Sequence, residues 1–154
     1  MRLQKATAFA LYAVLELATE PARQLTAVEI AEKYGISAHH LAKVLRDLGR
    51  AGLVDAVRGV GGGYRFSGNS KRLTLLDVIR IFEDVTADSE PLAPPAAGLD
   101  IAEGLNFVLA EIDAQTVATL RSISLSTMLK LIARRPWVGT TETKALGRAG
   151  RQGR

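Results

Sequence analysis

Five side chains able to donate hydrogen bonds or carry positive charge lie in one short segment of the sequence. They are His39, His40, Lys43, Arg46 and Arg50. The apolar residues between them recur every three or four positions, which predicts a helix with these five on its polar face. A helix that enters the major groove of DNA uses such groups to read base edges and to neutralise phosphates. The segment therefore favours a DNA-reading helix over the alternative, a charged face exposed only to solvent.

A glycine-rich stretch with an arginine on each side follows this segment. Arg58 and Arg65 flank a loop that contains Gly61 and Gly62. Glycine lets the backbone approach a phosphate or a narrow minor groove closely while an arginine enters it. The glycine spacing also resembles a nucleotide-binding loop, but a helix follows such a loop, whereas the β-prone residues 64–66 follow here. We expect a DNA-contacting hairpin tip, with a purely structural turn as the alternative.

Three further polar residues near predicted helix starts are candidates for phosphate contacts. They are Lys5, Thr7 and Ser37, which offer an ammonium group, hydroxyls and a helix N-terminus. The adjacent His39 and His40 point in different directions on a helix and so make a poor metal-binding pair. Because the sequence has no cysteine and no other histidine, no nucleophile and base can be assembled, and we expect no enzymatic activity.

Capping signals and periodicity predict the elements that position these residues. Thr26 and Glu29 form a capping box, Gly35 ends the helix that it opens, and Ser37 is the expected N-cap of the next helix. Two helices separated by so short a turn form a helix-turn-helix pattern. The predicted elements are helices over 5–19, 26–35, 37–49, from 74 onward, 100–121 and 124–131, and strands over 53–57 and 64–66.

A hairpin directly after a helix-turn-helix is the winged-helix arrangement. The predicted fold class is therefore mainly α with a small β-hairpin, a winged helix-turn-helix domain with a long dimerisation helix. The predicted divisions are a DNA-binding domain over 1–84, a Pro/Ala-rich loop over 85–99, the dimerisation helix and a short C-terminal helix over 100–131, and a basic, disordered tail over 132–154.

The long helix carries a narrow apolar seam suited to a second helix. Its members alternate four and three residues apart and are Ile101, Leu105, Val108 and Ile112. Leu109 and Leu120 lie beside this seam and are expected to pack on the body of the domain. The seam therefore suits a partner helix.

The net charge of +4 conceals an uneven distribution along the chain. Residues 37–72 carry +5, residues 73–129 carry −7, and residues 130–154 carry +6. Double-stranded DNA should meet the first of these blocks and avoid the second. The absence of cysteine excludes disulfides and thiolate metal sites, and no apolar run is long enough to cross a membrane. A cytoplasmic protein is expected.

Several short motifs recur in an order typical of one bacterial family. They are Ile30-Ala31-Glu32, Gly35-Ile36-Ser37, Ala51-Gly52-Leu53-Val54, Arg58-Gly59, Gly61-Gly62-Gly63-Tyr64 and the segment from Leu73 to Ile79. With these motifs, residues 1–130 resemble the Rrf-two type of bacterial winged-helix transcription regulators. The resemblance implies a homodimer on a semi-palindromic promoter site, with the third helix in the major groove and Arg58 of the wing in the minor groove.

The loop before the long helix departs from the pattern of that family. Sensor members hold an iron–sulfur cluster on three cysteines in this loop, whereas residues 88–105 contain neither cysteine nor histidine. Asp88, Glu90, Asp100 and Glu103 offer hard oxygen donors, which cannot replace thiolates. We therefore expect no iron–sulfur cluster and no metal cofactor.

The residues and the resemblance predict a sequence-specific DNA-binding transcription regulator that acts as a homodimeric repressor. Its control would come from a small-molecule or protein effector. The alternative is a protein-interaction module that acts through the long helix without recognising DNA. In that alternative, charge reversal at Lys43 and Arg46 would leave function intact.

Overall fold

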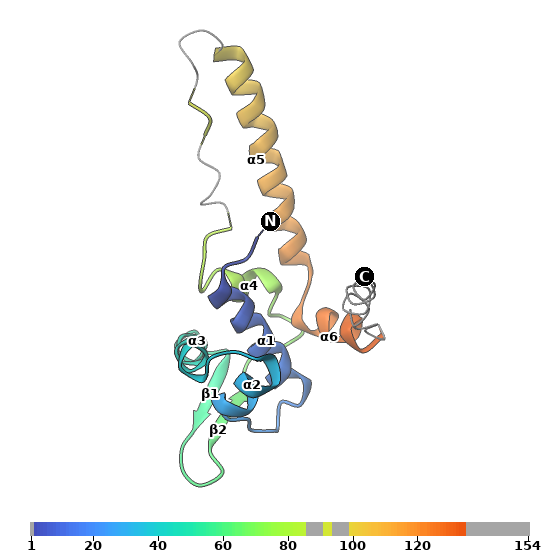
Figure 1. Ribbon diagram of the computed structural model, residues 1–154. Helices are drawn as coiled ribbons and strands as arrows, with labels where there is room; N and C mark the ends of the chain where they lie inside the picture. The colour runs from blue at the N-terminus through green and yellow to red at the C-terminus, as the bar shows by residue number, and fades with distance from the viewer. Residues whose placement is uncertain (1, 86–90, 94–98, 135–154) are drawn as a thin grey trace, which may run out of the picture.

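The computed structural model describes residues 2–85, 91–93 and 99–134. Its elements are, in chain order, α1 (Lys5–Thr19), α2 (Ala27–Tyr34), α3 (Ala38–Arg50), β1 (Val54–Val57), β2 (Gly63–Phe66), α4 (Leu75–Ile79), α5 (Leu99–Ser122) and α6 (Leu125–Arg134). Figure 1 shows a small body of helices with one hairpin, from which α5 projects. The predicted fold class, mainly α with a small β-hairpin, is confirmed.

The helix-turn-helix consists of α2 and α3, whose ends are set by local signals. The Thr26 hydroxyl accepts a hydrogen bond from the Glu29 N–H at 3.1 Å, and the Glu29 carboxylate accepts one from the Thr26 N–H at 2.7 Å, as predicted for a capping box. Gly35 ends α2 with a φ of 64°, a left-handed conformation that glycine adopts without steric cost. Ser37 occupies the N-cap position of α3, but its side chain makes no capping hydrogen bond. Ser37 is therefore the N-cap residue as predicted, although its hydroxyl does not contribute a capping hydrogen bond.

The hairpin is tied to the helix-turn-helix by backbone hydrogen bonds. β1 and β2 pair antiparallel, with Val54 opposite Phe66. Tyr64 in β2 also exchanges two backbone hydrogen bonds with Leu25, at 2.9 and 2.7 Å. Leu25 lies just before α2, and both it and Phe66 are buried. The hairpin therefore keeps a fixed position relative to α2 and α3.

The hydrophobic core lies among α1, α2, α3 and the hairpin. Leu17, Ile30 and Leu45 are among its fully buried side chains, and each contributes about 1.5–3 kcal/mol by leaving water. Leu125, the first residue of α6, is buried in the same core. The C-terminal helix α6 is therefore anchored to the N-terminal body.

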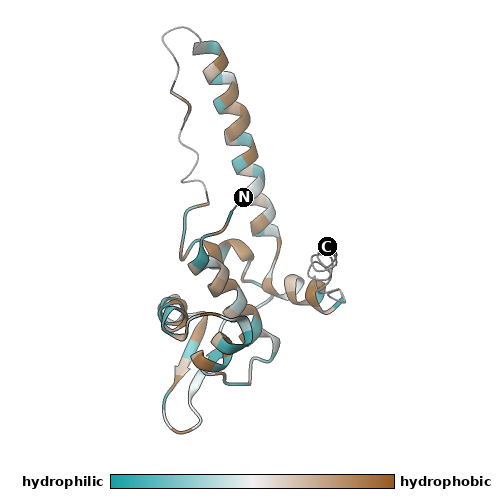
Figure 2. Cartoon of the chain, viewed as in Figure 1, coloured by the Kyte–Doolittle hydropathy of each residue, from teal (hydrophilic) through white to brown (hydrophobic). Residues whose placement is uncertain are grey.

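The C-terminal end of α5 lies at the body, and the N-terminal part of the helix projects away from it (Figure 1). The helix also contacts α4. Apolar residues recur along its length (Figure 2), and several of them are exposed. Leu120 is partly buried, but Leu109 is 43% exposed, because this part of α5 lies beyond the body. The expectation that Leu109 packs on the body is therefore wrong.

Some sequence predictions concern residues outside the described ranges. These are most of the loop over 85–99 and the tail from residue 135 onward. Residues 132–134 were assigned to the tail but form the last turn of α6. Within the described ranges, no helix is both long and apolar enough to cross a membrane.

Candidate nucleic-acid interface

The helix α3 presents a polar face because its apolar face is fully occupied by the core. Leu41, Val44, Leu45 and Leu48 are buried. The residues predicted to contact DNA are all exposed on the remaining surface, and they are Ser37, His39, His40, Lys43, Arg46 and Arg50. The structure therefore brings these predicted side chains together along one accessible helix face.

The tip of the hairpin joins β1 to β2 through Arg58 and the glycine-rich residues 59–62. Arg58 and Gly61 are exposed, and Gly62 is partly buried. A Cβ atom at position 62 would lie 2.4 Å from the carbonyl oxygen of Val57 and 2.8 Å from that of Gly59. Only glycine fits this close backbone turn. The glycines therefore shape the tip that holds Arg58 away from the body.

A groove separates α3 from the hairpin. It has a volume of about 600 Å³, and its lining includes Arg46 and Arg50 from α3 and Asp55 and Tyr64 from the hairpin. Two guanidinium groups on one wall suit an anionic backbone, because guanidinium binds phosphate through charge-assisted hydrogen bonds. The predicted helix and the two strands of the hairpin thus line one groove, and the tip lies at the far end of those strands.

The cations of this surface fall into two groups according to their partners. Arg50 lies 3.6 Å from the carboxylate of Asp47, and Arg65 lies 3.6 Å from that of Asp55. Lys43, Arg46 and Arg58 form no ion pair within the part of the chain that the structure describes. These last three side chains can therefore meet a phosphate without first leaving a carboxylate.

Two residues of α1 were also predicted to contact phosphate, and the structure separates them. Lys5 is exposed at the start of α1. Thr7 is fully buried, and its Oγ1 atom has no hydrogen-bond partner among the described residues. The predicted contact between Thr7 and phosphate is wrong, because that face of α1 packs into the core.

The imidazoles of His39 and His40 do not form a metal site. Their ring centroids are 6.1 Å apart and the rings are tilted by 52°. Among the described residues, no group of three or more His, Cys, Asp or Glu side chains could hold a metal ion. These histidines are therefore available as hydrogen-bonding groups at the start of α3.

A polar cluster between α1 and α2 was missed by sequence reasoning. Glu16 in α1 accepts hydrogen bonds from Lys33 Nζ at 2.7 and 2.8 Å and from the Tyr34 hydroxyl at 2.5 Å. The rings of Tyr34 and Tyr12 stack with centroids 5.2 Å apart. The cluster positions the last turn of α2, and thereby the turn into α3. Its members lie too far apart in sequence for any local pattern to pair them.

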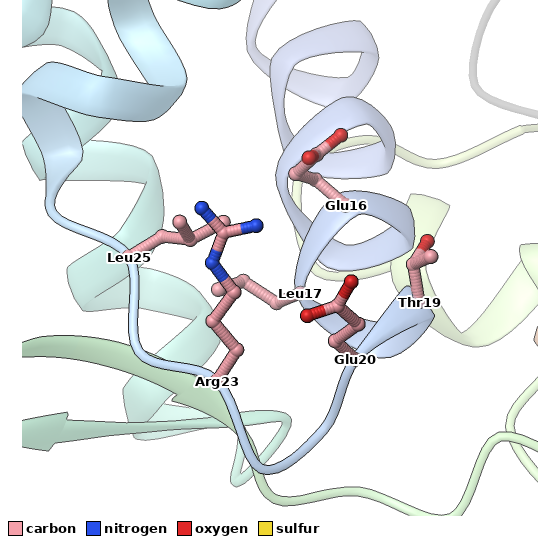
Figure 3. A pocket seen from close by; sticks show the side chains of 6 residues that line it. All are labelled: Glu16, Leu17, Thr19, Glu20, Arg23 and Leu25. Atoms are coloured by element: carbon pink, nitrogen blue, oxygen red, sulfur yellow. The ribbon is translucent and has the colours of Figure 1, made fainter.

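A small hollow next to this cluster lies between α1 and the turn that follows it. Figure 3 shows the Glu16 and Glu20 carboxylates on the α1 side and the Arg23 guanidinium beside Leu25. Its volume is about 30 Å³, which is room for little more than one water molecule. We therefore place the nucleic-acid interface at α3 and the hairpin rather than here.

The predicted dimerisation residues lie on the projecting part of α5. Ile101, Leu105, Val108 and Ile112 are 71%, 50%, 53% and 53% exposed. Apolar side chains left so exposed on one helix face are typical of an interaction surface. On another side of the helix, the Asn106 side chain bonds to the backbone of Leu92 at 2.8 and 3.2 Å, and so holds residues 91–93 against α5.

Residues 3–131 match the model of the Rrf2 family, which is described as iron-dependent transcriptional regulators. The chain belongs to the Rrf2 family. The resemblance seen in the sequence is thereby confirmed, and so is the predicted function as a DNA-binding transcription regulator. The alternative of an interaction module without DNA recognition is set aside. A transcription regulator is not typically an enzyme, which agrees with the expected lack of catalytic activity.

Relatives of known sequence or structure agree with this assignment. The chain is 54% identical over 132 residues to BadM of Rhodopseudomonas palustris, named as an HTH-type transcriptional regulator, across 86% of this chain and 83% of BadM. Its structure is similar to that of T. potens IscR, with a TM-score of 0.69, 25% identity, and coverage of 88% and 92% of the two chains. CymR, the global cysteine regulator of B. subtilis, has the same fold, with a TM-score of 0.69, 23% identity, and coverage of 85% and 98%.

The description of the family names iron dependence, and this chain lacks the thiolate donors of an iron–sulfur cluster. Iron–sulfur clusters are held by thiolates, and the sequence contains no cysteine. The described residues also contain no cluster of histidine and carboxylate side chains suited to a metal ion. The residues of this Rrf2 regulator therefore do not fit a cysteine-ligated cluster.

Proposed function

We propose that this Rrf2 regulator is a homodimeric repressor that binds a semi-palindromic site in double-stranded DNA. Each copy places α3 in the major groove and the tip at Arg58, Gly61 and Gly62 in the adjacent minor groove. The observation that carries this proposal is the exposed cationic face of α3, which shares a groove with the strands of a hairpin whose tip is rich in glycine.

The side chains of this surface have different roles in the proposal. His39 and His40, at the start of α3, face the base edges, because the N-terminal residues of a recognition helix lie deepest in the major groove. Lys43 and Arg46 neutralise phosphates, and Lys5 and Ser37 add contacts to the backbone. Arg50 and Arg65 contribute less, because Asp47 and Asp55 already pair with them.

The exposed seam of α5 joins the two copies. Two-fold symmetry then places two α3 helices on one side of the dimer, so that each reads one half-site. The dimer represses transcription when its site overlaps a promoter, because the bound protein excludes the polymerase.

In this proposal DNA binding needs no iron–sulfur cluster and no other metal cofactor. The donor chemistry of the chain supports this part, since thiolates are lacking throughout the sequence. A small-molecule or protein effector supplies the signal, and the protein works in the cytoplasm with the bacterial chromosome.

Selection of binding sites from random DNA tests the proposal. Duplexes of about 30 base pairs hold two half-sites one helical turn apart, so we would select from a random library of that length. The expected result is one two-fold symmetric motif, bound by two protein chains per duplex without added metal. Deleting one half of the motif should weaken binding by about 100-fold or more. Recovery of no common motif, or one chain per duplex with equal binding to the half motif, would overturn the proposal.

A further inference from the structure

A glycine lies within the exposed apolar surface of α5. Gly104 is one helical turn from Phe107, Ile101 and Val108, all of which are exposed. Phe107 is the most exposed of them, at 74%. The apolar surface is therefore wider than the seam predicted from the sequence, and it has a gap where Gly104 lacks a side chain.

Nothing within the described chain accounts for glycine at this position. A Cβ atom built on Gly104 would meet no atom within 4 Å, and its backbone is helical without a positive φ. Glycine in the interior of a helix is less stable than alanine, because it loses more conformational entropy on folding. The monomer would therefore be at least as stable with a side chain at position 104.

The positions around the helix show what surrounds this gap. At about 100° per residue, Gly104 lies between Phe107 on one side and Val108 and Ile101 on the other, and the exposed Asp100 lies one turn before it. A small hollow thus lies directly beside the largest apolar side chain of the helix. The hollow at Gly104 and the Phe107 ring beside it suit a partner surface with two features, a bulky group that fills the hollow and a recess that receives the ring.

A second copy of the same helix offers both features at once. In a two-fold symmetric contact, residue i of one copy touches residue j of the other, and residue j of the first touches residue i of the second. We propose that Phe107 of each copy packs over Gly104 of the other, and that this contact fixes where the two α5 helices cross. The inference rests on the proposed homodimer and names the contact that specifies it.

Three single substitutions in α5 test this contact. Gly104→Leu fills the hollow, and Phe107→Ala removes the group that enters it. Ala110→Leu is the matched control, because it adds the same kind of side chain to an exposed position on a different side of α5. Sedimentation equilibrium of the full chain measures the dimer dissociation constant, and circular dichroism confirms the helix content of each variant.

We expect Gly104→Leu and Phe107→Ala each to weaken the dimer by about tenfold or more, and Ala110→Leu by less than about twofold. The variant that carries both Gly104→Leu and Phe107→Ala should dissociate no more readily than whichever single variant forms the less stable dimer. The reason is that both single changes and the double change remove the same contact. Equal dimer dissociation constants for Gly104→Leu and Ala110→Leu would overturn this inference and leave the proposed homodimer intact. Additive effects of the two changes in the double variant would do the same. A wild-type chain that is monomeric would overturn the proposed homodimer itself.

Discussion

The hydroxyl of Tyr34 donates a hydrogen bond of 2.5 Å to the carboxylate of Glu16, joining the end of α2 to α1. Lys33 donates to the same carboxylate, and the Tyr12 ring stacks on the ring of Tyr34. The Glu16 side chain is only 18% exposed. This cluster holds α2 against the first helix, and α3 follows α2 after a short turn. The polar cluster therefore helps to set the position of α3 relative to α1.

Removing the Tyr34 hydroxyl should destabilise the fold modestly. A hydrogen bond from a neutral hydroxyl to a partly exposed carboxylate contributes on the order of 1 kcal/mol, so Tyr34→Phe should lower the free energy of unfolding by about that amount. Tyr12→Phe is the control, because it keeps the stacked ring pair and the Tyr12 hydroxyl makes no hydrogen bond within the described residues. Urea unfolding at neutral pH measures both variants. Equal losses in the two would contradict the role assigned to the Tyr34–Glu16 bond.

Acid should remove the contribution of Glu16 to stability. Burial raises the pKa of Glu16. Hydrogen bonds from Lys33 and Tyr34 and the charge of Lys33 lower it by more, so the net pKa lies below its ordinary value of 4.5. A carboxyl whose pKa is lowered by folding stabilises the fold above its unfolded pKa and loses that effect as pH falls through the folded value.

Glu16→Gln isolates this effect, since other carboxyls titrate alike in both proteins. The difference in free energy of unfolding between wild type and Glu16→Gln should be largest above pH 4.5 and should shrink as the pH falls below it. Urea unfolding across a pH series provides the measurement. A difference that stays constant down to strongly acidic pH would show that the charge of Glu16 contributes nothing.

Replacing Thr7 by valine should stabilise the protein without affecting DNA binding. The buried Thr7 hydroxyl has no hydrogen-bond partner in the part of the chain that the structure describes, and an unsatisfied buried group costs about 1–3 kcal/mol. Thr7→Val removes this cost with a side chain of similar shape, so the free energy of unfolding should rise by about 1 kcal/mol. Affinity for DNA should stay within about twofold of wild type, because the hydroxyl cannot reach a phosphate. A clear loss of affinity with unchanged stability would restore Thr7 as a contact.

The two arginines that flank the wing should differ in their effect on DNA binding. Arg58 is free of carboxylates within the described residues, whereas Arg65 is paired with Asp55. Arg58→Ala should weaken binding to the selected duplex by about tenfold. It should also reduce the slope of log affinity against log salt concentration by about 1, because one fewer counterion is released from the DNA. Arg65→Ala should have the smaller effect. Fluorescence anisotropy across a salt series measures both, and the reverse order would contradict the position assigned to the wing.

Much of the fold could be predicted from the sequence because it depends on local signals. The capping box of Thr26 and Glu29 and the glycine at position 35 set the ends of α2, and the leucines of α3 mark its buried face. The polar face of α3 follows from the same periodicity, so its DNA-contacting candidates could be named without a structure. Element type and one helix face are both properties of a short segment.

The remaining features depend on tertiary structure. The burial of Thr7 depends on which face of α1 meets the core, and the bond between Tyr34 and Glu16 joins residues of two different helices. The exposure of Leu109 depends on how far α5 extends beyond the body. The ion pair between Asp55 and Arg65 depends on the register of the two strands, whereas the pair between Asp47 and Arg50 spans one helical turn and follows a known spacing. Contacts between different elements are not contained in any local spacing rule.

Charge reversal on α3 tests the central claim most directly. The measurement is the ratio of dissociation constants for the scrambled and the selected duplex at one fixed salt concentration. Wild type should favour the selected duplex by about 1,000-fold or more. Lys43→Glu with Arg46→Glu should abolish this preference, whereas Arg121→Glu with Lys130→Glu, the same change of charge on exposed residues of α5 and α6, should retain it. Equal ratios for the two double variants would contradict the assignment of α3 as the helix that reads DNA.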